Sequence, residues 1–271
     1  MTSPAALLES TDFGVATPFH AEHRLCAETR VLAARYLSGE VGRTMANAAF
    51  AVDPEFLAKS PTPNQRYAES VRLIASQAPL RLLPGERLAG AATLLEATRH
   101  VTPASPFRSL SHTTIGFEKA LRIGYRGLRA EIDERLARGG LDAEGVDLLK
   151  AMKACLDAAG VWHGRYVAAL EARAAAHPEE RENCEAVLAA LRPVPENPPQ
   201  TFHQAVQALW MMWDFQRLCG NWSGIGRMDK MLGPFLRRDL NAGRITLDDA
   251  RELLAHFWIK GCEWITAQGR G

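Results

Sequence analysis

The stretch from Thr201 to Cys219 constrains the fold of this chain more than any other. Its sequence, TFHQAVQALWMMWDFQRLC, has helical periodicity, and large apolar side chains fall on nearly every side of the expected helix. A helix that is apolar all round is buried all round. Asp214, Gln216 and Arg217 within it argue against a membrane-spanning segment. We therefore predict a helical protein built around this segment.

Composition narrows the class of protein. The chain has 271 residues, of which 47% are hydrophobic and 23% charged, as in ordinary globular proteins. A net charge of +1 gives no electrostatic basis for binding nucleic acid or an anionic membrane. The five cysteines are odd in number and lack metal-clip spacing, so we expect reduced thiols, no metal site and a cytoplasmic protein. We see no signal peptide pattern and no apolar run long enough to span a membrane.

Periodic apolar positions predict further helices on both sides of this segment. We expect a loose arm at 1–18 and one folded unit over 19–271. Proline-rich residues 193–200 are expected to form a rigid corner. Gly160 and Gly164 are expected to bend their helix. The predicted helices cover residues 21–37, 65–77, 116–138, 142–176, 179–191, 201–219, 227–242 and 246 onward.

Smaller features complete the expected local structure. Asn64 is the expected N-cap of the helix at 65–77, and Thr201 with Gln204 is predicted to form a capping box. Pro84 and Gly85 indicate a turn, after which residues 88–90 are predicted to form a short buried strand. Gly124 and Gly127 are expected to let another backbone come close.

The loop at 220–226 carries three glycines around Asn221, Trp222 and Ser223. Such a loop can cradle a phosphate, but no convincing strand precedes it. A helix cap and connector is the interpretation that spacing alone favours.

Few single residues indicate chemistry by themselves. His112 lies just before a predicted helix and could relay a proton near neutral pH, although spacing alone favours a loop or capping role. We interpret the remaining candidates as structural: His163, His203, His256, Cys219, Cys262, Arg227 and Asp229.

Three segments match, in order, the motifs of one family. In residues 66–93 a helix and a proline-marked turn precede a G-E-x-x-x-G pattern, here Gly85, Glu86 and Gly90. In residues 111–128 a histidine is followed by F-x-K-x-L, and then by Gly124 and Gly127 in register.

The third segment is the one from Thr201 onward. It contains T-F, Q-x-x-W, a glycine loop, G-R-M-D, P-F and W-I-K in the family's order and spacing. Together the three segments resemble the N-terminal part of glycyl radical enzymes, the pyruvate formate-lyase-like superfamily.

The resemblance implies a fold and a mechanism. It implies that this mainly α-helical chain is the N-terminal helical part of a ten-stranded α/β barrel. In such enzymes a cysteine thiyl radical attacks a small organic substrate and a C-terminal glycine stores the radical. A separate radical S-adenosylmethionine activating enzyme with an iron–sulfur cluster installs it. The complete family member is expected to be an anaerobic, homodimeric lyase or dehydratase.

The resemblance also implies site residues. The histidine of the second segment, here His112, assists loss of the leaving group in dehydratase-like members, although Ser111 replaces the usual glycine before it. The loop before G-R-x-D lines the substrate pocket. Its positions here are Asn221, Trp222 and Ser223, with tryptophan replacing a smaller polar residue.

The chain departs from the family in one respect. Neither the radical cysteine loop nor the glycine loop is recognisable, and Cys262 stands where the family has a helix interior. We therefore expect a chain truncated at its C-terminus, inactive alone, whose helix at 201–219 needs covering by absent strands. The alternatives are one half of a split enzyme, completed by a second chain, and a catalytically silent helical binding module. The substrate is not identified.

Overall fold

The computed structural model describes residues 25–45, 59–91, 113–221 and 223–263. These residues form helices and coil, and within them the sole β-type contact is a parallel bridge between Thr114 and Gly224. The predicted mainly α-helical fold is confirmed, whereas the arm predicted at 1–18 lies outside the described residues.

The described helices are α2 (Ala27–Leu37), α3 (Glu40–Met45), α5 (Pro63–Gln77), α7 (Phe117–Ala137), α8 (Ala143–Ala176), the 3₁₀ turn η4 (Pro178–Glu180), α9 (Arg181–Leu191), α10 (Phe202–Leu218), α11 (Met228–Asn241) and α12 (Leu247–Gly261).

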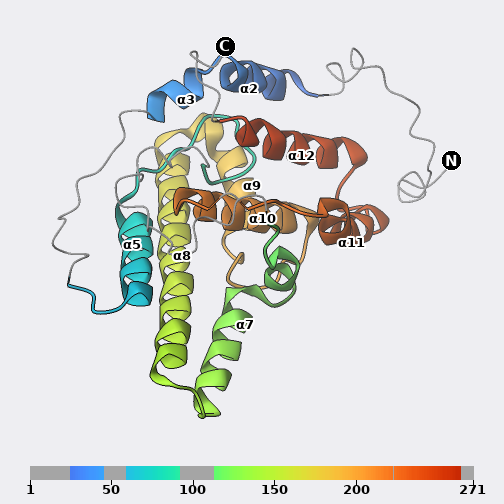
Figure 1. Ribbon diagram of the computed structural model, residues 1–271. Helices are drawn as coiled ribbons and strands as arrows, with labels where there is room; N and C mark the ends of the chain where they lie inside the picture. The colour runs from blue at the N-terminus through green and yellow to red at the C-terminus, as the bar shows by residue number, and fades with distance from the viewer. Residues whose placement is uncertain (1–24, 46–58, 92–112, 222, 264–271) are drawn as a thin grey trace.

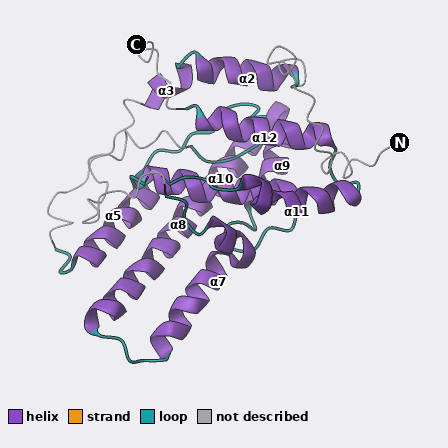
Figure 2. Cartoon of the chain, turned by 45° about the vertical axis from the view of Figure 1, so that its right-hand side comes forward, coloured by secondary structure: helices purple, strands orange, loops and turns teal. Residues whose placement is uncertain are grey.

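The helices pack as two crossing groups (Figures 1 and 2). Helices α5, α7 and α8 run side by side, and α7 and α8 form a long hairpin. Helix α10 crosses them and also contacts α9, α11 and α12, while α2 packs on the outer side of α12. None of the described helices combines the length and apolar composition that crossing a membrane requires.

Helix α10 lies at the centre of this arrangement. Nearly all of its residues are buried, including Trp210 and Leu209, which have no exposed surface. The prediction of an all-round buried helix is confirmed. The expectation that its cover would be absent is wrong, because the neighbouring helices and the coil at 79–91 surround it.

The coil at 79–91 replaces the predicted strand. The side chain of Gln207 in α10 accepts a hydrogen bond from the Ala89 N–H at 2.8 Å and donates one to the Ala89 carbonyl at 2.9 Å. Asn183 in α9 donates to the Glu86 carbonyl at 2.9 Å. Side chains thus satisfy backbone groups that a sheet would otherwise pair.

Helix caps differ from prediction at two positions. The Thr62 hydroxyl, and not Asn64, caps α5, and Pro63 occupies the first helical position where its missing N–H costs nothing. Asn64 instead donates to Asp147 on α8. Thr201 caps α10 as predicted, but Gln204 accepts from the N–H of residue 200 rather than completing a capping box. The complete capping box belongs to Thr246 at the start of α12.

The glycine predictions in the α7–α8 hairpin have different outcomes. Gly124 has φ +67° and kinks α7, so that the Tyr125 N–H donates to the Pro195 carbonyl in the corner at 193–200. A Cβ there would lie 2.4 Å from the Glu196 carbonyl oxygen, which confirms the predicted close approach of another backbone at Gly124. At Gly127 the prediction is wrong, because the atoms nearest to a Cβ there belong to the Ile123 side chain of the same helix. Helix α8, however, runs unbroken through Gly160 and Gly164, and no bend is found.

Candidate functional site

The loop that follows α10 is held by the last turn of that helix. Gly220 takes φ +88°, a left-handed conformation that glycine adopts without strain and other residues rarely take. Its N–H donates to the Arg217 carbonyl, and the Asn221 N–H donates to the Gln216 carbonyl, both at 2.9 Å. The loop therefore begins as the helix cap that its spacing favours.

Ser223 is fixed at both its backbone and its side chain. The indole N–H of Trp213 donates to the Ser223 carbonyl at 3.0 Å, and the Ser223 hydroxyl donates to the Gln216 side chain at 3.0 Å. The guanidinium of Arg217 lies over the Trp213 ring, 4.9 Å from its centroid. One turn of α10 thus positions the predicted substrate-binding serine.

The segment at 113–116 lies against this loop. The Gly224 N–H donates to the Thr113 carbonyl at 3.2 Å, and Thr114 forms the parallel bridge with Gly224. Gly226 has φ +82°, and a Cβ there would lie 2.7 Å from the Thr114 methyl group. The two chain regions that the family motifs assign to the site are therefore neighbours in space. His112 and Trp222 themselves lie outside the described residues, and their predicted roles stay predictions.

Asn221 connects the loop to an apolar cavity. Its side-chain amide donates to the Tyr67 hydroxyl at 3.3 Å, and Tyr67 lines a cavity of about 600 Å³ between α5, α7 and α8. Burial raises the pKa of Tyr67, so its hydroxyl is neutral. Leu128, Met152 and Phe215 also line this space, whose size and apolar walls are typical of sites for small organic molecules.

The cysteines near this region are thiols and not thiolates. Burial raises the pKa of Cys155, which lines the cavity, to about 11 and raises that of Cys219 well above its usual value. All five cysteines are free. The interpretation of Cys219 as a small buried apolar residue agrees with this environment.

The histidines of the described helices are held by structural contacts. His256 has almost no exposed surface, and its Nδ1 accepts from the Arg87 N–H at 3.2 Å. Burial is the main cause that lowers its pKa, to about 3, so the ring is neutral. His203 Nε2 bonds the Arg87 carbonyl at 2.9 Å, and burial lowers its pKa also. Arg227 and Asp229 form an exposed pair that holds the pKa of Asp229 at about 2.

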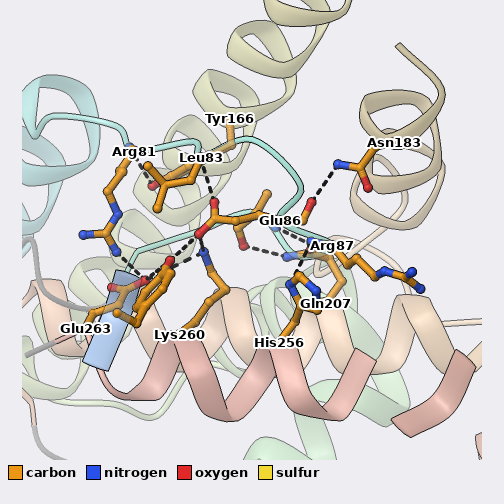
Figure 3. Close-up of polar contacts among 12 residues, drawn as sticks. Arg81, Leu83, Glu86, Arg87, Tyr166, Asn183, Gln207, His256, Lys260 and Glu263 are labelled. Carbon is orange, nitrogen blue, oxygen red and sulfur yellow. Dashed lines mark hydrogen bonds and ion pairs between the residues drawn. The ribbon is translucent and has the colours of Figure 1, made fainter. Parts of the chain in front are cut away.

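A buried ionic cluster lies beside α10, and sequence analysis missed it (Figure 3). Lys260 Nζ lies 2.7 Å from a Glu86 carboxylate oxygen and 3.7 Å from Glu263, which pairs with Arg81. The Tyr36 hydroxyl donates to Glu86. Glu86 and Lys260 belong to the motifs of the first and third segments, but nothing in their spacing indicates that they pair. The cluster joins α2, α12 and the coil at 79–91.

The described residues offer one grouping of possible metal ligands, His177, Glu179 and Glu180. His177 and Glu179 are exposed, and Glu180 already pairs with Arg173 at 2.6 Å. Exposed groups of this kind are common in proteins without a bound ion, so this one is not by itself evidence of a metal site.

Comparison with known proteins shows matches to one protein family and to solved structures with the same fold. The model of the pyruvate formate lyase-like family matches residues 65–269. An isethionate sulfite-lyase from Oleidesulfovibrio alaskensis is 36% identical over 177 residues, 61% of this chain and 21% of that protein. A trans-4-hydroxy-L-proline dehydratase from Clostridioides difficile is 30% identical over 163 residues, 56% of this chain and 20% of that protein.

A solved structure shares the fold. The B12-independent glycerol dehydratase from Clostridium butyricum superposes with a TM-score of 0.72 at 14% identity, covering 91% of this chain and 41% of that one. The chain thus spans about a fifth of the length of the curated relatives that it matches.

Proposed function

The chain belongs to the pyruvate formate lyase-like family of glycyl radical enzymes, and from this premise we propose that it forms the helical layer and part of the substrate wall of a glycyl radical lyase or dehydratase. The observation that carries the proposal is the contact between the segment at 113–116 and the loop at 220–226, which brings the family's two substrate-contacting regions together. The substrate is a small organic molecule handled in an anaerobic cytoplasm.

The radical residues are supplied from outside the matched portion. The sequence holds neither radical loop, and the chain corresponds to about a fifth of its curated relatives. The thiyl cysteine and the glycyl radical belong to a further length of polypeptide, continuous with this chain or a separate complementing chain. A radical S-adenosylmethionine enzyme activates the assembly, which forms a homodimer in its complete form. This chain alone is inactive.

Within that assembly the residues of this chain bind and orient. Gln216 and Trp213 hold Ser223, and Tyr67 holds Asn221, so that the loop presents a fixed surface to a substrate. His112 transfers a proton to the leaving group. Tryptophan at position 222, where the family has a smaller polar residue, indicates a pocket that differs from those of other members.

Co-expression tests this proposal. The chain is produced under anaerobic conditions with the polypeptide encoded directly downstream and with a radical S-adenosylmethionine activating enzyme. We expect an electron paramagnetic resonance signal of a glycyl radical only when all three are present. A glycyl radical in this chain without the downstream polypeptide would overturn the proposal. So would downstream DNA that encodes neither radical loop.

In the active assembly, replacing His112 by alanine should reduce turnover far more than stability. Loss of a positioned general acid typically costs about 10²–10⁴-fold in rate, and a residue that acts by proton transfer should leave the melting temperature nearly unchanged when it is replaced. Steady-state turnover and the melting temperature are measured on the same preparation. Unchanged turnover would contradict the catalytic role and favour a capping or packing role for His112.

A second candidate function is a catalytically silent helical binding module. The burial of α10 by its own neighbours favours it, since the described residues enclose their core without any strand. The same co-expression separates the candidates, because a silent module yields no radical and no turnover with any downstream polypeptide.

A further inference from the structure

Asp214 is a buried acid that the proposed chemistry does not use. It lies in the C-terminal half of α10 with no exposed surface. Among the residues that the structure describes, neither of its carboxyl oxygens has a hydrogen-bond partner of ordinary geometry, and the indole N–H of Trp210, one turn earlier, has none either. A buried carboxylate in such a position is disfavoured, because it loses its hydration without gaining a hydrogen bond of good geometry.

The backbone of Gly90 lies against this acid. A Cβ at Gly90 would lie 1.9 Å from Asp214 Oδ2 and 2.8 Å from Trp210 Nε1, so the acid and the indole both pack against the bare glycine. Gly90 has φ +113°, which turns the coil toward α10. The contact therefore joins the coil at 79–91 directly to the central helix.

The four charges of the buried cluster balance one another without Asp214. Arg81 and Lys260 supply two positive charges, and Glu86 and Glu263 supply two negative ones. A third carboxylate would leave the cluster with uncompensated negative charge at low dielectric. The titratable groups that act on Asp214, or on which it acts, are Glu263, Lys260, Tyr125 on α7, Tyr166 on α8 and Cys219 at the end of α10.

The residues beside Asp214 hold the candidate site. Trp213 precedes it and donates to Ser223, and Gln216 accepts from Ser223 two positions later. A shift of this part of α10 away from the coil would therefore move the loop at 220–226.

We infer that Asp214 is a positioning residue, kept as an uncharged carboxylic acid against Gly90, which fixes α10 and hence the site loop to the coil at 79–91. This inference goes beyond the proposed function and rests on it only in treating the loop as a substrate site. The protonation of Asp214 can be tested on the isolated chain, whatever its catalytic role.

The pH dependence follows from the sign of the pKa shift. Burial raises the pKa of Asp214 well above its usual value, and repulsion from Glu263 adds to this rise. Lys260 and the backbone amides of Phe215 and Ala91 oppose it. The folded state thus holds a proton that the unfolded state releases above a pH of about 4. Its stabilising contribution is complete below that pH and is lost as the pH rises toward the folded pKa.

Replacing Asp214 by asparagine keeps the shape and removes this titration. We expect Asp214→Asn to raise the melting temperature at about pH 8 and to flatten its decline between about pH 5 and 8. The wild-type protein should show the infrared band of a protonated buried carboxyl, and the variant should lack it. Asp239→Asn is the matched control. That buried carboxylate accepts from the Phe202 N–H at 2.6 Å and pairs with Arg244 at 2.7 Å, so its loss should lower the melting temperature.

Amide hydrogen exchange tests the positioning role. Asp214→Ala removes the contact with Gly90 and should speed exchange in residues 219–226, while α8 keeps its protection. Asp214→Asn should leave both segments protected. The inference is overturned if Asp214→Asn destabilises the chain as Asp239→Asn does, if the infrared band is absent, or if exchange in Asp214→Ala rises equally in α8 and the loop.

Discussion

Replacing Gly90 by alanine should destabilise the chain by about 2–5 kcal/mol. Overpacking a well-filled interior costs typically about 1–3 kcal/mol, and an alanine held in a left-handed conformation adds about 1–2 kcal/mol. Both costs apply here, because Gly90 has φ +113° and its new methyl group would lie 1.9 Å from Asp214 Oδ2. Urea unfolding followed by circular dichroism measures the change.

Gly85→Ala provides the matched control. Gly85 lies in the same coil with φ +77°, but no atom lies within 4 Å of the position its Cβ would take. Only the backbone cost of about 1–2 kcal/mol then applies. Equal losses in the two variants would show that the contact with Asp214 is not tight, and would weaken the positioning role assigned to that acid.

The central helix and its ends could be predicted from the sequence because their signals are local. Apolar residues on all sides of 201–219 require burial, and Thr201 and Thr246 precede their helices as caps. The family resemblance added the helical layer of a larger barrel fold, which the likeness to solved structures supports. Each of these signals lies within one short segment or one ordered set of motifs.

The coil at 79–91 could not be predicted, because its backbone is paired by distant side chains. Gln207 lies 118 positions from Ala89, and Lys260 lies 174 positions from Glu86. Likewise, Asn64 does not cap its helix as predicted but donates a hydrogen bond to Asp147, 83 positions away. Such pairings depend on tertiary packing and produce no periodic pattern in the sequence.

The candidate site was predictable in its location but not in its supports. The motifs indicated that the region of His112 and the loop at 220–226 belong to one site, and the described parts of both are adjacent. The hydrogen bonds from Trp213 to Ser223, from Ser223 to Gln216, and from Asn221 to Tyr67 carry no sequence signature.

The largest single electrostatic effect is expected at Lys260. Replacing it by methionine should cost about 3–5 kcal/mol, the usual result of breaking a buried ion pair. Lys260 has no exposed surface, and its ammonium group lies 2.7 Å from Glu86. Without it, the hydrogen-bond partners that Glu86 keeps among the described residues are the Tyr36 hydroxyl and the Leu83 N–H, and its buried charge loses its ammonium partner.

A double variant separates this charge effect from lost packing. Lys260→Met with Glu86→Gln removes both charges. The glutamine oxygen can still accept from the Leu83 N–H, and its amide group can donate to the Tyr36 hydroxyl, so much of the lost stability should return. Lys153→Met is the control, because Lys153 pairs with Asp133 at 2.6 Å on the exposed face of the α7–α8 hairpin. An exposed pair contributes about 0.2–1 kcal/mol. If Lys260→Met costs no more than Lys153→Met, or if adding Glu86→Gln deepens the loss, the cluster does not hold α12 to the coil by charge. In that case the hydrogen bond between Tyr36 and Glu86, and not the ion pair, would stabilise the packing of the helices on the coil at 79–91.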